Sequence, residues 1–326
     1  MTTLVLDVAA DSGGALTVLK KFYDDFSKDR ENKYVLVTGV VDLESTDNVT
    51  VVKLPWAKKS WFHRLYVDFI YVHKLIEKYD VDYIFSLQNT CVLNTKIPQS
   101  LYVHQPLPFC GIQFGLREHP KFWVYQNVIG RLILLSAKKA EKVIVQTQWM
   151  KDAVIKKAGI REDRILLEAP EVNLQIDERF SETAYDNMFF YPASNYVYKN
   201  HSVIFDAMNE LKKNGISNYK VVLTLTYDEL TDICKQKYEA VQENVDLVGH
   251  IDLKEVYGYY SKTVLLFPSY IETYGLPLKE ASMVGSPIIA ASTPFAHEIL
   301  DGYVEAKFFA YNDAKKLAEL MKNKIQ

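Results

Sequence analysis

Strand-like apolar runs alternate with amphipathic helical patterns along almost the whole chain. Near the start, the apolar run Leu4–Val8 precedes a helical pattern in which apolar residues from Leu16 to Phe26 share one face. Strands that alternate with helices form βαβ units, in which the strands are parallel and the helices cover the sheet. The pattern therefore predicts the α/β fold class, with parallel sheets throughout.

The alternation is interrupted once, between Glu168 and Asn187, where periodicity is lost and polar residues dominate. We predict a linker there and two Rossmann-like domains, residues 1–170 and 171–326. A chain of 326 residues is long for one core, and each half can bury its own. Ligands of such domains bind at the carboxyl ends of the strands. In the second half we expect these elements: strands Met188–Tyr191, Val245–Leu247, Val264–Phe267 and Pro287–Ala290, and helices His201–Lys213, Asp228–Val241 and Asn312–Lys324.

Composition narrows the class of protein. Hydrophobic residues make up 48% and charged residues 24% of the chain, as in globular proteins. The net charge of −3 argues against a duplex nucleic-acid partner, which would need an excess of Lys and Arg. The three cysteines, Cys91, Cys110 and Cys234, are far apart and odd in number, which favours a reducing compartment. No secretory signal or bilayer-spanning run is seen, so we expect a cytoplasmic protein.

The stretch Phe267–Ala281, FPSYIETYGLPLKEA, joins a buried strand to a helix. Gly275 and Pro277 predict a helix that begins near Leu276, because proline is tolerated in a first helical turn and glycine permits close backbone approach. The unpaired N–H groups of a helix start attract anions. Glu272 and Glu280 flank this end, and carboxylates there would bind hydroxyl donors. A nucleotide sugar, with a diphosphate between two hydroxylated rings, fits both features.

This stretch resembles the donor-site signature of retaining glycosyltransferases of family four, which have the GT-B fold. Glu272 and Glu280, with YGLP between them and SMVGSPIIA after them, carry the resemblance. It implies a metal-independent enzyme with an acceptor-side first domain and a donor-binding second domain. The activity implied is transfer of a sugar from a nucleotide diphosphate to a hydroxyl of a cell-envelope glycan or lipid-linked acceptor. No cofactor is implied besides the donor substrate.

Within this resemblance we assign Glu272 to sugar hydroxyls and Glu280 to the ribose. Lys199, in YPASNYVYKNHS, matches a lysine that neutralises the leaving diphosphate, whereas Ser194 or Asn195 stands where many members have arginine. His104, at the end of a predicted strand, is assigned to the reacting centre. The predicted catalytic residues are therefore His104, Lys199 and Glu272. The predicted donor-binding residues are Gly13, Gly14, Asn195, Lys199, Gly249, His250, Ile251, Glu272, Tyr274, Gly275, Leu276 and Glu280.

Two of these groups act through the backbone. Asp11, Ser12, Gly13 and Gly14 follow the first strand and precede a helix, where a phosphate or sugar could approach. A plain strand-to-helix turn explains this run equally well. Gly249–Ile251 matches the segment that holds the nucleotide base in the family. The Asp80–Asp82 run DVD is interpreted as a lead-in to a strand, and no metal site is predicted.

The region from Trp56 to Tyr79 combines aromatic and basic residues with an apolar face at Phe62, Leu65, Tyr66, Phe69, Ile70 and Ile76. Basic amphipathic helices can lie in a membrane interface. We favour packing of this face against the sheet and leave either peripheral membrane contact or acceptor contact open for residues 56–64.

Family members usually end with a helix that packs back on the first domain, and this chain stops at Gln326. Interdomain closure could then be looser, or a partner chain could supply such contacts, so a homo- or hetero-oligomer stays open. Two other functions remain as alternatives: a nucleotide-sugar epimerase, and a non-catalytic subunit that binds a glycan or stabilises a partner.

Overall fold

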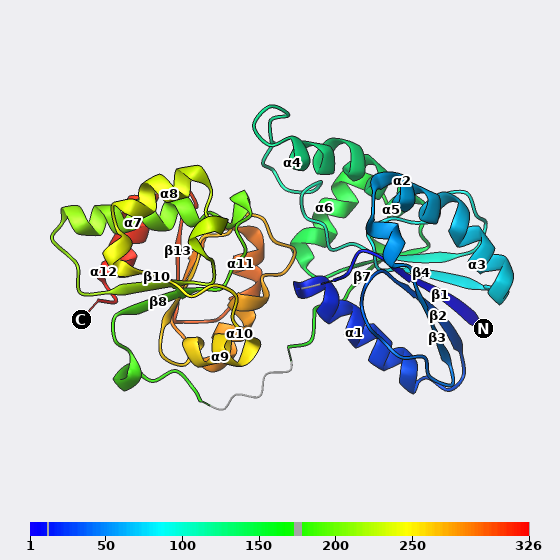
Figure 1. The fold of residues 1–326 in the computed structure, drawn as a ribbon, viewed down its shortest axis with the longest axis horizontal. Coiled ribbons are helices and arrows are strands. Elements are labelled where there is room, and N and C mark those ends of the chain that lie inside the picture. The colour runs from blue at the N-terminus through cyan, green and yellow to red at the C-terminus, as the bar shows by residue number, and fades with distance from the viewer. Residues whose placement is uncertain (12, 173–177, 326) are drawn as a thin grey trace. The chain divides into compact units, whose positions relative to one another are not determined.

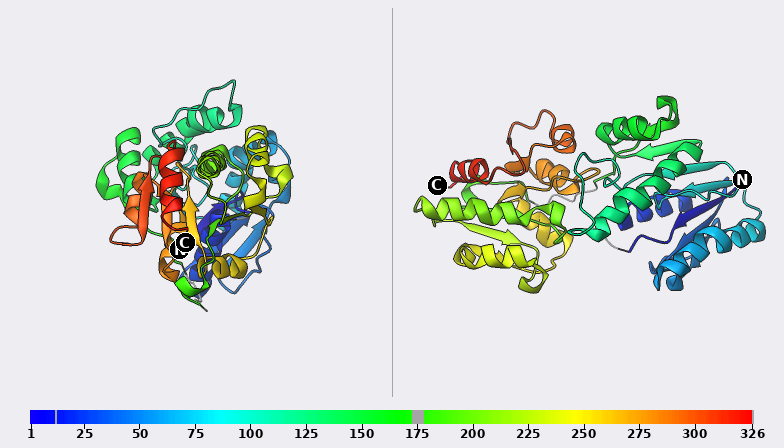
Figure 2. Two further views of the ribbon diagram at one scale, coloured as in Figure 1. Left: turned by 90° about the vertical axis from the view of Figure 1, so that its left-hand side faces the viewer. Right: turned by 90° about the horizontal axis from the view of Figure 1, so that it is seen from above.

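The protein is described by a computed structural model that covers residues 1–11, 13–172 and 178–325. Ser12 of the predicted glycine loop and part of the predicted linker therefore lie outside the described residues. The chain divides into two compact units, Met1–Pro170 and Glu171–Gln326. Each unit contains a parallel sheet between helices (Figures 1 and 2), so the predicted α/β class is correct.

The first unit holds a seven-stranded sheet in the order β3-β2-β1-β4-β5-β6-β7. All of its strand pairs are parallel. The first three strands are added in one direction from β1 and the later strands in the other, so β1 lies next to β4. Its strands are β1 (Thr2–Asp7), β2 (Lys33–Thr38), β3 (Val49–Lys53), β4 (Tyr83–Ser86), β5 (Gln99–Tyr102), β6 (Lys142–Val145) and β7 (Ile165–Leu167). Its helices are α1 (Gly13–Lys28), α2 (Trp61–Tyr66), α3 (Val72–Tyr79), α4 (Pro120–Val124), α5 (Gly130–Lys139) and α6 (Gln148–Ala158).

Alternate residues of the first sheet pack into cores on its two faces. Leu4 and Ile84 face α3, whereas Val5 and Leu36 face α1. Leu101 packs against α5 and α6, and it pairs in register with Ser86, two residues beyond Ile84. The helices α2, α3, α5 and α6 therefore cover one face and α1 covers the other (Figure 1).

The second unit holds a six-stranded sheet in the order β10-β9-β8-β11-β12-β13, again with parallel pairs. The crossover direction reverses between β8 and β11. Its strands are β8 (Met188–Tyr191), β9 (Lys220–Leu223), β10 (Val245–Leu247), β11 (Val264–Phe267), β12 (Ile288–Ala291) and β13 (Ala306–Phe309). Its helices are α7 (His201–Lys213), α8 (Asp232–Glu239), α9 (Leu253–Tyr260), α10 (Leu276–Val284), α11 (Pro294–Ile299) and α12 (Ala314–Lys322).

The expected helix over 228–241 is wrong in its first part. A short 3-10 turn occupies Tyr227–Glu229, and α8 begins only at Asp232. The segment contains two helix N-caps, Thr226 and Thr231, so a second helix start interrupts the expected continuous helix. Thr226 and Glu229 form a reciprocal capping box, and the Thr231 side chain then accepts a hydrogen bond from the Cys234 N–H.

The expected packing of the apolar face of residues 61–79 is also wrong. Phe62 and Phe69 are exposed, whereas Val67 is fully buried. The reason is a π-helical segment, Val67–Tyr71, between α2 and α3. A π-turn adds one residue, which rotates the following helix face by about 100°. The buried face of α3 therefore does not continue the face that is apolar in α2.

Across the described parts of the chain, no helix is long and apolar enough to cross a membrane. The strand β13 has no counterpart among the predicted elements. It pairs with β12 at the edge of the sheet, and its central Lys307 is exposed.

Candidate functional site

The reversal of strand order between β8 and β11 places two loops side by side at the carboxyl edge of the second sheet. Open α/β sheets bind ligands at this kind of switch point, because the loops after the two strands run to opposite sides. The loop after β8 leads through a 3-10 turn, Val197–Lys199, into α7. The loop after β11 contains Glu272 and leads into α10. The topology thus brings Lys199 and Glu272 together from positions 73 residues apart in the sequence.

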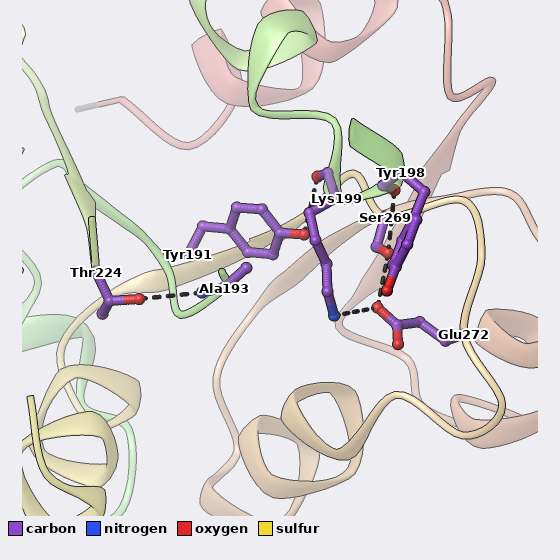
Figure 3. Close-up of polar contacts among 7 residues, drawn as sticks. All are labelled: Tyr191, Ala193, Tyr198, Lys199, Thr224, Ser269 and Glu272. Atoms are coloured by element: carbon purple, nitrogen blue, oxygen red, sulfur yellow. Dashed lines mark hydrogen bonds and ion pairs between the residues drawn. The ribbon is translucent and has the colours of Figure 1, made fainter. Parts of the chain in front are cut away.

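Lys199 and Glu272 form an ion pair in which the Lys199 Nζ lies 2.5 Å from Oε1 of Glu272. The Ser269 hydroxyl donates to the same carboxylate oxygen at 2.7 Å. The Tyr191 hydroxyl donates to the Lys199 carbonyl at 2.9 Å and fixes the backbone below the lysine. Figure 3 shows the lysine side chain extended toward Glu272. Both side chains are mostly buried, 19% and 17% exposed, so the site holds one cation and one anion at close range.

The start of α10 lies directly after this loop. Gly275 has φ +88°, a left-handed conformation that suits glycine, and Leu276 and Pro277 open the helix as predicted. Among the residues that the structure describes, no side chain caps the first turn of α10. Its first N–H groups therefore retain the capacity to bind an anion. Tyr274, just before the helix, is buried, and burial raises the pKa of its phenol.

Glu280 is the fifth residue of α10, one turn beyond the helix start. Its Oε2 accepts a hydrogen bond from the Tyr260 hydroxyl at 3.2 Å. Burial raises the pKa of the Glu280 carboxyl, and the tyrosine hydrogen bond opposes part of that rise. The glutamate is thus a partly desolvated acceptor with a fixed orientation.

Asn195 and His250 meet at Glu229, a residue that the predicted site did not include. The Asn195 side-chain amide donates to the Glu229 carbonyl. The His250 Nε2 lies 2.8 Å from the Glu229 Oε1. Hydrogen bonds from the Thr226 N–H and from His250 lower the pKa of Glu229. The signal that could have revealed Glu229 is the Thr226-x-x-Glu229 capping box, which marks a turn at this sheet edge.

The backbone at Gly249–Ile251 follows β10 at the same sheet edge. Gly249 has φ +68°, and its N–H donates to the Leu225 carbonyl at 3.2 Å. This bond ties the segment to the loop after β9.

His104 lies in the first unit, two residues beyond β5. The Asn89 Oδ1 accepts the His104 backbone N–H at 2.7 Å, so its amide nitrogen faces the His104 Nε2 at 3.1 Å and must donate to it. The imidazole proton is thereby assigned to Nδ1, which is buried with no partner in the described chain. Burial lowers the pKa of His104 to about 4, so the ring is neutral at pH 7. Asn89 was missed because nothing in its local sequence distinguishes it from other loop asparagines.

Gly13 begins α1 with φ +58°, and Gly14 follows it within the helix. The same sheet edge holds Asp7, whose Oδ1 accepts the Ala10 N–H at 3.2 Å while its Oδ2 is buried with no partner among the described residues. Burial raises the pKa of Asp7 to about 7. Asp7 was read as part of an apolar strand, because only the structure shows its depth.

The Asp80–Asp82 run has structural roles. Asp80 ends α3 with φ +48°, and Asp82 Oδ2 accepts the Thr2 N–H at 2.7 Å. Over residues 1–11, 13–172 and 178–325, no group of three or more His, Cys, Asp or Glu could hold a metal ion. The three cysteines are free.

The sequence of the second unit is similar to that of a known protein family. Residues 175–325 match the model of the family Glycosyl transferases group 1. The O-antigen chain mannosyltransferase RfbU of Salmonella typhimurium is 22% identical over 241 residues, which are 72% of this chain and 64% of RfbU. An uncharacterized 41.2 kDa protein of the Klebsiella pneumoniae cps region is 30% identical over 116 residues, 35% of this chain and 31% of that protein. The matches thus span less than two thirds of either relative.

Solved structures show the same fold. Anabaena HepE in complex with UDP and glucose has a TM-score of 0.70 and 16% identity, covering 99% of this chain and 89% of HepE. Sucrose-phosphate synthase from Thermosynechococcus elongatus has a TM-score of 0.72 and 16% identity, with coverages of 99% and 88%. At these identities the likeness concerns the fold alone. The chain has the GT-B fold, as predicted.

Proposed function

We propose that this chain is a metal-independent retaining glycosyltransferase of family four, which moves a sugar from a nucleotide diphosphate to a hydroxyl of a cell-envelope glycan or a lipid-linked acceptor. The match of residues 175–325 to Glycosyl transferases group 1 supports sugar transfer. The observation that carries the donor assignment is the Lys199–Glu272 pair at the switch point, next to the uncapped start of α10. RfbU, an O-antigen chain mannosyltransferase, supports an envelope acceptor.

A nucleotide sugar can replace both contacts of this ion pair. Its phosphate oxygens offer Lys199 an anion, and its sugar hydroxyls offer Glu272 hydrogen-bond donors. Each partner therefore exchanges one charge-assisted contact for another when the donor binds. As the sugar–phosphate bond breaks, negative charge grows on the departing diphosphate, and the Lys199 ammonium stabilises it most at that stage.

The remaining residues take positioning roles in this proposal. Gly275 and Leu276 present the α10 N–H groups to phosphate, Glu280 accepts from the ribose, and the backbone of Gly249–Ile251 holds the base. His104 donates its Nδ1 proton in a hydrogen bond at the reacting centre, and Gly13 and Gly14 admit the donor. The acceptor attacks on the face that the diphosphate leaves, and a leaving-group oxygen takes the acceptor proton.

A non-catalytic subunit is the second candidate function. One observation favours it. Asn195, near the position where many members have arginine, carries no charge, and its amide is held by the Glu229 carbonyl. The diphosphate then has one cation fewer for stabilisation. An epimerase of related fold would share the donor contacts and would need no acceptor.

A donor panel separates these functions. UDP-glucose, UDP-galactose and GDP-mannose are each incubated with the protein, with and without lipid-linked and envelope glycan acceptors, and free nucleotide and sugar products are measured. Acceptor-dependent nucleotide release, with retained configuration in the product, supports the proposal. An isomerised donor supports the epimerase. No product with any donor, together with glycan binding, supports the subunit. Activity that disappears with EDTA and returns with a divalent cation would contradict metal independence.

Two lysine variants test the assigned role. Lys199→Met should lower the transfer rate by roughly 10²-fold, the cost of removing one group that stabilises the charge of a leaving group. Lys237→Met is the matched control, because Lys237 also forms a carboxylate pair, with Asp206 at 2.6 Å, on the α7–α8 surface. The control should retain wild-type activity. Equal losses in both variants would mean that Lys199 acts only through stability.

A further inference from the structure

The helix that begins at Trp61 presents an exposed apolar face. Its members lie between 39% and 84% exposed, and large apolar side chains that gather in one surface patch mark interaction sites. We call these residues the α2 face. They are Trp61, Phe62, Leu65, Tyr66, Phe69 and Ile70.

The α2 face belongs to an ordered helix. The Ser60 side chain accepts from the His63 N–H, and the Arg64 Nε lies 2.8 Å from Asp68 Oδ2. On the opposite side of the helix, Val67 is fully buried in the core of the first unit. Trp56, partly buried against the same core, contacts the rings of Tyr66 and Tyr71 and so anchors the Tyr66 edge of the face. The apolar side chains are therefore held outward by packing on the other side and are not exposed by fraying.

The helices near the α2 face carry an excess of positive charge, which favours a negatively charged partner. Residues 55–80 and 111–139 carry ten Lys or Arg against four Asp or Glu, a formal charge of +6, whereas the whole chain carries −3. These segments contain α2, α3, α4 and α5, of which α2, α3 and α5 lie on the same side of the first sheet (Figure 1). Lys59 and Lys74 are exposed, and neither forms an ion pair with a described residue. These two segments are thus basic in a chain that is acidic elsewhere.

We propose that the α2 face docks on the surface of an anionic lipid bilayer. Aromatic and aliphatic side chains enter the boundary between headgroups and acyl chains, and the basic residues around them contact anionic headgroups. The alternative occupant is a second copy of the chain. A symmetric dimer through this face would bring two layers of positive charge together, which opposes it. Docking goes beyond the proposed transfer of sugar and holds whether or not transfer occurs.

The test is co-sedimentation of the full chain with phosphatidylcholine vesicles that contain or lack phosphatidylglycerol. The wild type should sediment with the anionic vesicles and much less with the neutral ones. Phe62→Ser/Phe69→Ser should bind at least roughly tenfold more weakly, because two apolar rings are lost from the interface. Lys59→Gln/Lys74→Gln should lose roughly fivefold per lysine on the anionic vesicles.

Ile233→Ser/Leu253→Ser is the matched control, since both residues are exposed apolar side chains of the second unit. It should bind vesicles like the wild type. Binding of UDP and GDP without vesicles, and the thermal unfolding temperature, should be unchanged in the Phe and Lys variants. These readouts separate a failure of docking from a failure of the donor assignment.

Wild-type protein that stays in the supernatant with anionic vesicles would overturn the proposal. So would a Phe62→Ser/Phe69→Ser variant that sediments like the wild type. Self-association of the wild type in analytical ultracentrifugation, lost in the Phe variant, would assign the α2 face to a second copy instead.

Discussion

At the scale of single residues, the Lys199–Glu272 pair explains how a site for a charged, hydroxylated ligand stays stable without one. An unpaired lysine or glutamate at this depth would carry a desolvation cost of several kcal/mol. Pairing offsets that cost, and Ser269 adds a second hydrogen bond to the glutamate. Because the donor offers new partners to both ends, opening the pair leaves neither charge isolated. The pair therefore stabilises the empty site and does not prevent the donor from binding.

Glu280 provides a residue-scale prediction in which function and stability change in opposite directions. Glu280→Gln keeps an oxygen that can accept from the Tyr260 hydroxyl but removes the charge. We expect affinity for UDP or GDP to fall roughly tenfold, because the ribose loses a charge-assisted hydrogen bond. Isothermal titration calorimetry at pH 8 measures this loss.

The stability of the same variant depends on pH. Burial raises the pKa of Glu280 in the folded state above its unfolded value. The wild type therefore binds more protons when folded, and it loses stability as the pH rises from the unfolded to the folded pKa. Gln has no such loss, so the variant should gain stability relative to the wild type between pH 4.5 and pH 8. Denaturant melts at both pH values check this. A variant that is destabilised at pH 8 would indicate a structural role for the carboxylate.

At the scale of elements, α10 carries a left-handed glycine at each end, which gives a matched pair of variants. Gly275 precedes the first turn with φ +88°, and Gly285 follows the last turn with φ +93°. Alanine at either position should lower the free energy of unfolding by about 1–2 kcal/mol, because an L side chain is strained there. Only Gly275→Ala changes the proposed phosphate end, where the added Cβ would lie 3.3 Å from the Leu278 side chain and shift the first turn of the helix. It should also weaken nucleotide binding by about 1 kcal/mol, roughly fivefold.

Chemical denaturation and nucleotide titration of the two variants separate these effects. An equal loss of nucleotide affinity in Gly285→Ala would mean that general destabilisation, and not the helix start, causes the change.

The sequence predicted elements best where short apolar runs end in turn residues. The strands β8, β10 and β11 and the start of α10 agree with the predictions to the residue. Strands such as β8 and β11, whose residues are almost all buried, leave little choice of register. The edge strand β13 was missed because its exposed Lys307 breaks the apolar run. The π-helical segment before α3 was missed because an extra residue in a helix leaves no sequence signal when the apolar residues on both sides continue.

The candidate site was predictable only where a local pattern marks it. Glycine and proline mark the start of α10, and the resemblance over FPSYIETYGLPLKEA selected Glu272. The ion pair between Glu272 and Lys199 could not be derived, because it depends on which strands become neighbours at the switch point. The same holds for Asn89 and His104, which meet only because β4 lies next to β5.

At the scale of the whole molecule, the proposed site residues divide unequally between the two units. Those assigned to the nucleotide and diphosphate are mostly in Glu171–Gln326, whereas Gly13, Gly14 and His104 belong to Met1–Pro170. Each unit has its own sheet and cores, so local stabilisation by a ligand can be assigned to one unit at a time. Hydrogen exchange measured by mass spectrometry resolves this.

We expect a bare nucleotide, UDP or GDP, to slow exchange in the second unit, at residues 249–251 and 272–284. At a ligand concentration of about 100 times the dissociation constant, the stabilisation is about 2.7 kcal/mol, or roughly 100-fold in exchange that requires the binding site to unfold. The matching nucleotide sugar should add protection at residues 13–14 and 104, because the sugar is the part assigned to His104. Lys199→Met at the same ligand concentration should show less protection at 272–284. Protection by the bare nucleotide that is confined to the first unit would reverse the assignment of the donor to the second, because every proposed base, ribose and phosphate contact except the Gly13–Gly14 loop lies there.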